Sequence, residues 1–165
     1  MSIGEGSDTN LNTMRGRDFP AIRQFTVFME NRVGQLLEVV RRFEGTGIRV
    51  AALSINDSAE CAFVRLVLSD CERGRELLER AGLAIIETDL LGVELPDGPQ
   101  PLLRVCTALL AAEINIIQAY PLLSRPNGEP AVALMVDNID LAMDTLNNKG
   151  FRMITEGDLK DDSIE

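Results

Sequence analysis

Hydrophobic and polar positions along the chain follow two alternating periods, and the order of those periods occurs twice. In the first half, runs rich in strand-forming residues alternate with segments whose apolar side chains recur every three or four positions, the spacing of an amphipathic helix. The two central runs flank a short polar turn and therefore predict a hairpin. The resulting order is βαββαβ, over residues 24–30, 33–43, 48–55, 61–68, 70–82 and 83–87.

The second half of the chain repeats this order, and the first predicted helix of each half carries the clearest match. Its apolar positions recur at a constant offset, so that Leu36, Leu37, Val40 and Phe43 correspond to Leu102, Leu103, Cys106 and Leu109. The flanking strand, the hairpin, the second helix and the last strand cover residues 90–95, 114–122, 130–136, 137–149 and 151–155. The chain is therefore interpreted as two homologous units in tandem.

A βαββαβ unit forms a four-stranded antiparallel sheet with both helices on one face. We therefore predict the α+β class, with two ferredoxin-like units, residues 21–88 and 89–156, paired side by side. Such pairing buries long apolar strands that would otherwise form exposed sheet edges. Residues 1–20 are polar and Gly-rich and residues 157–165 are acidic, so we expect a flexible N-terminal tail and a loose C-terminal tail.

Charge and composition exclude several classes of function. The 26 acidic and 16 basic residues give a formal net charge of −10, and no stretch collects the Lys and Arg that bind a nucleic-acid backbone. No apolar run reaches the roughly 20 residues of a membrane helix, and the first ten residues lack the basic and apolar parts of a signal peptide. We expect a cytoplasmic protein with neither nucleic acid nor a membrane as partner.

Side chains suited to catalysis are sparse. The chain has no histidine, which removes the commonest general base and a common metal ligand. The three cysteines, Cys61, Cys71 and Cys106, form no CxxC pair, so neither a disulfide framework nor a zinc site is indicated. Because the pattern also holds no nucleophile–base pair or phosphate loop, we expect no catalytic residues, no metal, no cofactor and no enzymatic activity.

One segment carries a family resemblance. Residues 25–53, FTVFMENRVGQLLEVVRRFEGTGIRVAAL, resemble the ACT domain, which opens with a strand, an Asp/Asn-Arg-Pro-Gly loop, a helix and then Gly-Ile/Val-Asn-Ile. The first unit is especially similar to the regulatory domain of 3-phosphoglycerate dehydrogenase. The resemblance implies two ACT units that bind an amino acid and report its level to an enzyme or transporter.

The resemblance also implies which residues contact the ligand. In the first unit they are the loop, the first helical turn and the position of the family's strand Asn, namely Asn31, Arg32, Val33, Gly34, Gln35, Leu36 and Arg49. In the second unit they are a displaced loop and the matching strand, namely Asp97, Gly98, Asn115 and Ile116. Because each half retains only part of the site, we expect a composite pocket between the two units.

The loop residues have physical reasons to bind a zwitterion. Gly34 lets the backbone approach a ligand closely, the N–H groups of the following helix attract a carboxylate, and Asn31 offers a donor and an acceptor. A purely structural interpretation remains open, with Asn31 as a helix cap, Gly34 as a turn residue and Arg49 in a surface ion pair.

The leading hypothesis is a regulatory protein, a homodimer, that senses an amino acid and controls a separate metabolic enzyme in trans. The alternative is a regulatory or scaffold subunit of an amino-acid biosynthetic enzyme that binds no ligand itself. Three positions favour the alternative. The dehydrogenase has His where this chain has Met29 and Pro where it has Val33, and the family has Asn where it has Arg49. Branched-chain, serine and aspartate-family amino acids all remain possible ligands.

Overall fold

A computed structural model of the protein describes residues 21–30, 32–57 and 61–161. The predicted N-terminal tail, residues 1–20, therefore lies outside the described residues. The strands are β1 (Ile22–Met29), β2 (Val50–Asp57), β3 (Ala62–Leu68), β4 (Ile85–Glu94), β5 (Ile116–Pro121), β6 (Ala131–Val136) and β7 (Met153–Ile154). The helices are α1 (Gln35–Arg41), α2 (Cys71–Arg80), α3 (Pro101–Ala111), α4 (Ile139–Asn148) and α5 (Glu156–Asp161), with a 3-10 turn, η2 (Pro126–Gly128).

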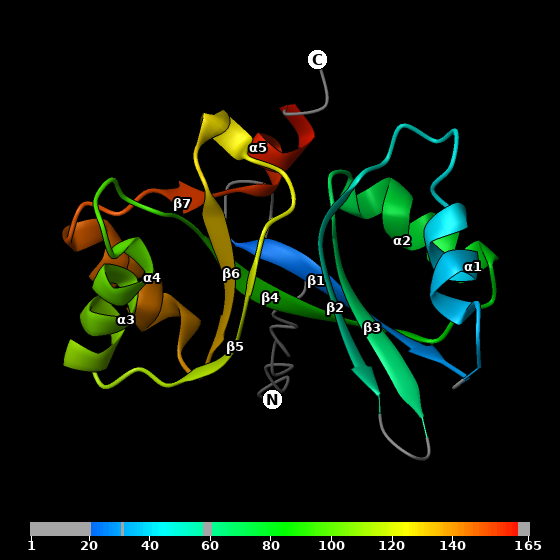
Figure 1. Ribbon diagram of the computed structural model, residues 1–165, viewed down its shortest axis with the longest axis horizontal. Coiled ribbons are helices and arrows are strands. Elements are labelled where there is room, and N and C mark those ends of the chain that lie inside the picture. Colours follow the sequence, from blue (N-terminus) through cyan, green and yellow to red (C-terminus); the bar gives the residue numbers. More distant parts are fainter. Residues whose placement is uncertain (1–20, 31, 58–60, 162–165) are drawn as a thin grey trace, which may run out of the picture.

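The strands of the described residues form one seven-stranded antiparallel sheet in the order β2-β3-β1-β4-β6-β5, with β7 also paired to β4. The first unit has the order β2-β3-β1-β4, and the second has the equivalent order β5-β6-β4-β7. In Figure 1 the two units lie side by side. The predicted α+β fold of two ferredoxin-like units is confirmed.

Strand β4 belongs to both units. Its first part pairs with β1, and its last part pairs with β6 and β7. The sequence predicts two separate strands here, over residues 83–87 and 90–95. Because no glycine or proline interrupts residues 85–91, the extended backbone instead continues through the expected unit boundary after residue 88.

Helices α1 to α4 cover the outer face of this curled sheet. Buried side chains of β1 and β3 pack with α1 and α2 in one cluster, which includes Phe25 and Leu78. Those of β4 and β6 pack with α3 and α4 in another, which includes Leu91 and Leu109. Figure 1 shows the first helix pair at one end of the molecule and the second pair at the other. Over the described ranges, no helix is both long and apolar enough to cross a membrane.

The inner face of the sheet holds a third cluster, the shared core. Its members come from both units: Ile22, Ala51, Ala52, Val67, Leu90, Tyr120, Leu122, Ala131, Ala133, Ile154 and Leu159. A buried hydrogen bond crosses it, because the Tyr120 hydroxyl donates to Gln24 Oε1 at 2.6 Å. The sheet edges also meet where the Leu123 amide donates to the Ala51 carbonyl at 2.7 Å. The two units are therefore joined by a common strand and a common core.

Residues 156–161 form a short helix instead of the loose tail predicted from residue 157. This helix, α5, buries Leu159 in the shared core. Its start is capped reciprocally: Thr155 N donates to Asp158 Oδ2 at 2.9 Å, and Asp158 N donates to Thr155 Oγ1 at 3.2 Å. The prediction of a loose tail is wrong for residues 157–161, because they form a helix with a capped start and a buried apolar side chain.

Candidate functional site

The predicted ligand loop joins β1 to α1 and borders a small cavity, here called the loop cavity. Its volume is about 180 Å³, and it is lined by Met29, Glu30, Arg32, Gly34, Gln35, Leu36, Ile55 and Ala62. Gly34 has φ 90° and begins α1 without a side-chain cap. A Cβ atom on Gly34 would meet nothing within 4 Å. The left-handed backbone, rather than a lack of space, therefore favours glycine at this turn.

Charged groups form the rim of the loop cavity. Arg32 Nε lies 3.2 Å from Glu30 Oε2, and Arg32 Nη2 lies 3.5 Å from Glu38 Oε2. Gln35 Nε2 donates to the same Glu38 oxygen at 3.1 Å. Because the ion-paired side chains are all more than half exposed, each pair contributes only ~0–1 kcal/mol and exchanges readily. Arg32 can therefore bind the α-carboxylate of an amino acid, while the neighbouring carboxylates bind its α-ammonium group.

The other first-unit candidates lie away from this cavity or outside the described residues. Asn31 belongs to the residues that the structure does not describe. Val33 lies in the loop with a fully exposed side chain. Arg49 is exposed just before β2, whereas Ile55, which lines the cavity, lies toward the other end of that strand. The backbone N–H of Arg49 donates to Ser69 Oγ at 2.9 Å.

The second-unit candidates occupy equivalent places in their own unit. Asp97 and Gly98 precede α3, and the Asp97 carbonyl accepts a hydrogen bond from Arg104 Nη1 at 3.2 Å. The exposed Asn115 donates its N–H to Asp137 Oδ1 at 3.1 Å, and Ile116 is partly buried against the second-unit core. None of these residues lines the loop cavity. The structure does not bring the two sets together within one chain, because the shared strand places α1 and α3 at opposite ends (Figure 1).

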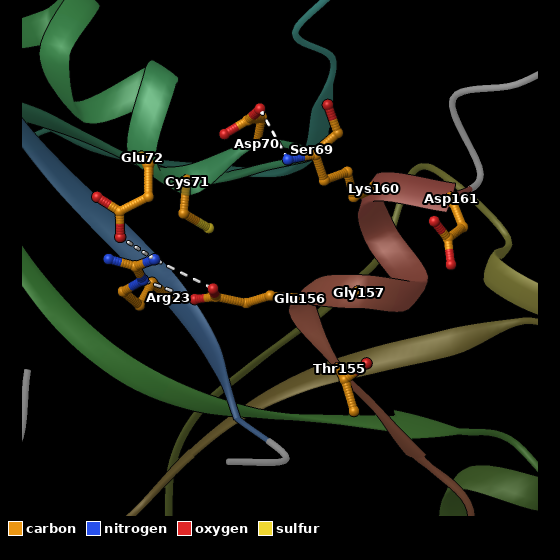
Figure 2. A pocket seen from close by; sticks show the side chains of 10 residues that line it. All are labelled: Arg23, Ser69, Asp70, Cys71, Glu72, Thr155, Glu156, Gly157, Lys160 and Asp161. Carbon is orange, nitrogen blue, oxygen red and sulfur yellow. Dashed lines mark hydrogen bonds and ion pairs between the residues drawn. The ribbon is translucent and has the colours of Figure 1, made fainter. Parts of the chain in front are cut away.

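A second cavity, of about 270 Å³, lies between the two units where α2 and α5 approach each other (Figure 2). Its lining residues come from the start of β1, the start of α2 and the region of α5. They are Arg23, Ser69, Asp70, Cys71, Glu72, Thr155, Glu156, Gly157, Lys160 and Asp161. The sequence did not single out any of them as a ligand-binding residue.

Ion pairs span this inter-unit cavity, and Arg23 takes part in two of them. Arg23 Nε lies 2.6 Å from Glu156 Oε1, and Arg23 Nη2 lies 2.8 Å from Glu72 Oε1. Lys160 Nζ lies 3.4 Å from Asp70 Oδ2. The hydrogen bond from Arg23 holds the pKa of Glu72 below its ordinary value, and the bond to Glu156 raises the pKa of Arg23. These five residues form an ionic clasp that joins α5 to the first unit.

Cys71 is buried beside the ionic clasp. Burial raises the pKa of its thiol to about 12, and Sγ donates weakly to the Leu68 carbonyl at 3.7 Å. A thiol that stays protonated at neutral pH is a poor nucleophile and a poor metal ligand. Across the part of the chain that the structure describes, no group of three or more His, Cys, Asp or Glu side chains is placed to hold a metal ion.

Sequence reasoning missed the ionic clasp because its partners are far apart along the chain. Arg23 and Glu156 are separated by 133 positions, and neither belongs to a recognisable motif. One local signal was present, since Thr155 and Asp158 have the spacing of a helix-start capping box. That spacing would have predicted α5, but not its partner across the cavity.

Comparison with known proteins agrees with this architecture. A sequence profile described as an ACT domain pair matches residues 20–162. Among solved structures, a protein of Bacteroides thetaiotaomicron is similar over 85% of this chain and 96% of its own, with 26% sequence identity and a TM-score of 0.76. The ligand-free regulatory subunit of aspartate kinase from Thermus thermophilus is similar over 78% of this chain and 91% of its own, with 13% identity and a TM-score of 0.53. The search of curated proteins gives no match.

The profile covers both units and the strand that they share. The likeness to the aspartate kinase subunit is one of fold alone, and the resemblance of the first unit to 3-phosphoglycerate dehydrogenase remains a prediction. The strand order that occurs twice and the match to the profile together show that this chain belongs to the ACT family, as an ACT domain pair.

Proposed function

We propose that this protein binds a free amino acid and thereby regulates a separate metabolic enzyme. The loop cavity carries the proposal, because it lies at the turn between β1 and α1 that the sequence predicts as the ligand loop. Arg32 on its rim suits the α-carboxylate, and Glu30 suits the α-ammonium. The exposed pair between these two side chains costs little to open.

Regulation in trans is supported by the kind of protein that shares this architecture. The Thermus thermophilus relative is a regulatory subunit of aspartate kinase, and the similarity extends over 91% of that subunit. In the present chain the loop cavity lies at the end of β1, which pairs along the strand common to both units. A ligand that binds one arrangement of this loop more tightly than another would shift the whole pair toward that arrangement.

A second wall over the loop cavity is part of the proposal. A micromolar complex requires about 8 kcal/mol, whereas exposed ion pairs contribute at most about 1 kcal/mol each. Val33 and Leu37 beside the cavity expose large apolar side chains. We propose that a second copy of the chain covers them in a homodimer, so that ligand binding and association are coupled.

Thermal unfolding against each standard amino acid tests the function. At a hundredfold excess over the dissociation constant, a true ligand adds ~2.7 kcal/mol to the stability and raises the midpoint by several degrees. Arg32→Ala should abolish this rise and leave the ligand-free midpoint unchanged, because Arg32 is exposed. Arg80→Ala is the matched control, since Arg80 is also exposed and ion-paired but lies on α2. A panel in which no amino acid raises the midpoint would contradict the proposal.

The alternative is a regulatory or scaffold subunit that binds no ligand. It is favoured by the pairing of Arg32 with two carboxylates, which already balances the only positive charge among the described residues that line the loop cavity. This function predicts a flat thermal panel together with co-purification of an intact biosynthetic enzyme. The leading proposal predicts a specific shift with the purified protein alone.

A further inference from the structure

We infer that the loop cavity selects an amino acid with an aliphatic side chain, an inference that rests on the proposed function. Its polar groups and its apolar groups are segregated. Glu30, Arg32 and Gln35 lie together in the loop and the first turn of α1, whereas the strand residues that line it are all apolar. A zwitterion bound with its head group at these polar residues directs its side chain to the strands.

The floor of the loop cavity is built from three adjacent strands. Met29 of β1 lies directly opposite Ala62 of β3 in the antiparallel register. Ile55 of β2 lies opposite Val64, two positions farther along β3. Because side chains alternate between the faces of a sheet, Met29, Ala62 and Ile55 share the face that carries the helices. Leu36 from α1 completes an aliphatic floor.

This floor remains open because α1 begins only at Gln35. Farther along the same sheet face, Phe25 and Val27 are buried in the hydrophobic core beneath α1 and α2. At the cavity, in contrast, the Ile55 side chain is still 48% exposed. An aliphatic side chain of a ligand would cover this apolar surface, which α1 leaves exposed, and the burial of that surface would favour binding.

The same floor disfavours polar side chains. None of the four floor residues, Met29, Leu36, Ile55 and Ala62, has a side-chain oxygen or nitrogen. A ligand hydroxyl or carboxylate placed against them would lose its hydrogen bonds to water without a replacement. Of the three classes that the sequence left open, branched-chain amino acids therefore fit, and serine and aspartate do not.

Dissociation constants for the individual amino acids, measured by calorimetry on the full chain, test this selectivity. We expect valine, leucine or isoleucine to bind most tightly, and Ile55→Asn to weaken that binding roughly ten-fold or more. Ile117→Asn is the matched control, because Ile117 is 58% exposed and lies on β5, the other edge strand of the sheet. It should leave the dissociation constant unchanged.

The outcomes separate this inference from the proposed function. Tighter binding of serine, threonine or aspartate that Arg32→Ala abolishes would overturn the aliphatic class and retain the sensor. Equal effects of Ile55→Asn and Ile117→Asn would also overturn the inference, because the ligand would then bind away from the floor. If no amino acid binds at all, both the inference and the proposed function are overturned.

Discussion

Arg23 shows how one side chain can join two structural units. Its side chain is only 14% exposed, that of Glu156 is 21% exposed, and two nitrogens of the guanidinium contact this carboxylate. A hydrogen bond to a charged group contributes about 1.5–3 kcal/mol when it is shielded from water, whereas an exposed ion pair contributes ~0–1 kcal/mol. Single charge changes should therefore affect stability at the ionic clasp far more than on the open surface.

Glu156→Gln should destabilise the protein by about 1.5–3 kcal/mol, because Arg23 then loses its closest anion while remaining mostly buried. Glu76→Gln is the control, since Glu76 pairs with Arg80 at 3.9 Å on the exposed side of α2. It should change stability by less than about 0.5 kcal/mol. Urea unfolding of the two variants measures the difference. Equal losses of stability would show that the ionic clasp contributes no more than an exposed ion pair.

The Glu72 carboxylate should make stability depend on pH. The hydrogen bond from Arg23 lowers its pKa in the folded protein below the ordinary value of 4.5, so folding favours the ionised form. This contribution is fully present above pH 4.5 and is lost as the pH falls through the folded-state pKa. The stability difference between the wild type and Glu72→Gln should therefore shrink between pH 6 and pH 3 in urea unfolding. A difference that stays constant over this range would rule out the assigned ion pair.

At the scale of elements, strand β4 and helix α5 hold the pair together. The approach of β7 to β4 depends on Gly92, because a Cβ atom there would lie 2.8 Å from Ile154 Cβ and 3.3 Å from Ile22 Cδ1. Both neighbours are fully buried in the shared core. The strand that joins the units therefore has no room for even one added methyl group at this position.

Gly92→Ala should destabilise the protein by about 1–3 kcal/mol, because Ile154 and Ile22 must shift within a packed core. Gly157→Ala is the control. The nearest contact of its added methyl group is Thr155 Oγ1 at 3.5 Å, an ordinary separation, and alanine favours the helical backbone of α5. Thermal midpoints should fall for the first variant only. A similar fall for both would mean that β7 does not need this close approach.

The elements that could be predicted from sequence are those specified by local pattern. The helix with Leu36 and Val40 and its counterpart with Leu102 and Leu109 follow from apolar spacing, although α1 ends at Arg41, before the predicted last residue Phe43. The hairpins follow from apolar runs around polar turns. The continuity of β4 was missed because the pattern predicts where strands occur, but not which two partners a single strand pairs with along its length. Only the three-dimensional register of the sheet decides that.

The candidate site was predictable to the same local extent. Arg32, Gly34, Gln35 and Leu36 are close in the chain, and they do line one cavity. Ile55 and Ala62 join that cavity only because β2 and β3 pair beside β1. The spacing of residues along the chain does not indicate this proximity, because it depends on which strands pair and in which register.

At the scale of the whole molecule, a shared core joins the two units, in addition to the core that each unit forms under its own helices. Leu159 of α5 is buried in that core together with residues of both units. The Tyr120–Gln24 hydrogen bond and the Leu123–Ala51 contact between the sheet edges add to it. The pair should therefore unfold as one cooperative unit, because the apolar inner face of each half is buried only against the other half.

Leu159→Ala should lower the stability of the whole pair by about 2–5 kcal/mol in a single transition, because it opens a cavity in the shared core. Leu110→Ala is the control, since Leu110 is an exposed leucine on α3, and it should have little effect. Calorimetric unfolding distinguishes the cases. Two separate transitions in either variant would show that the units fold independently.

Hydrogen exchange of the full chain, with and without a saturating aliphatic amino acid, tests most directly whether the loop cavity binds the ligand. We expect slower amide exchange at residues 32–37 and around Ile55 and Ala62, where the cavity is lined. Arg32→Ala should remove that protection. Unchanged exchange in the loop, or protection confined to the second unit or to the ionic clasp, would contradict an amino-acid sensor built on this cavity.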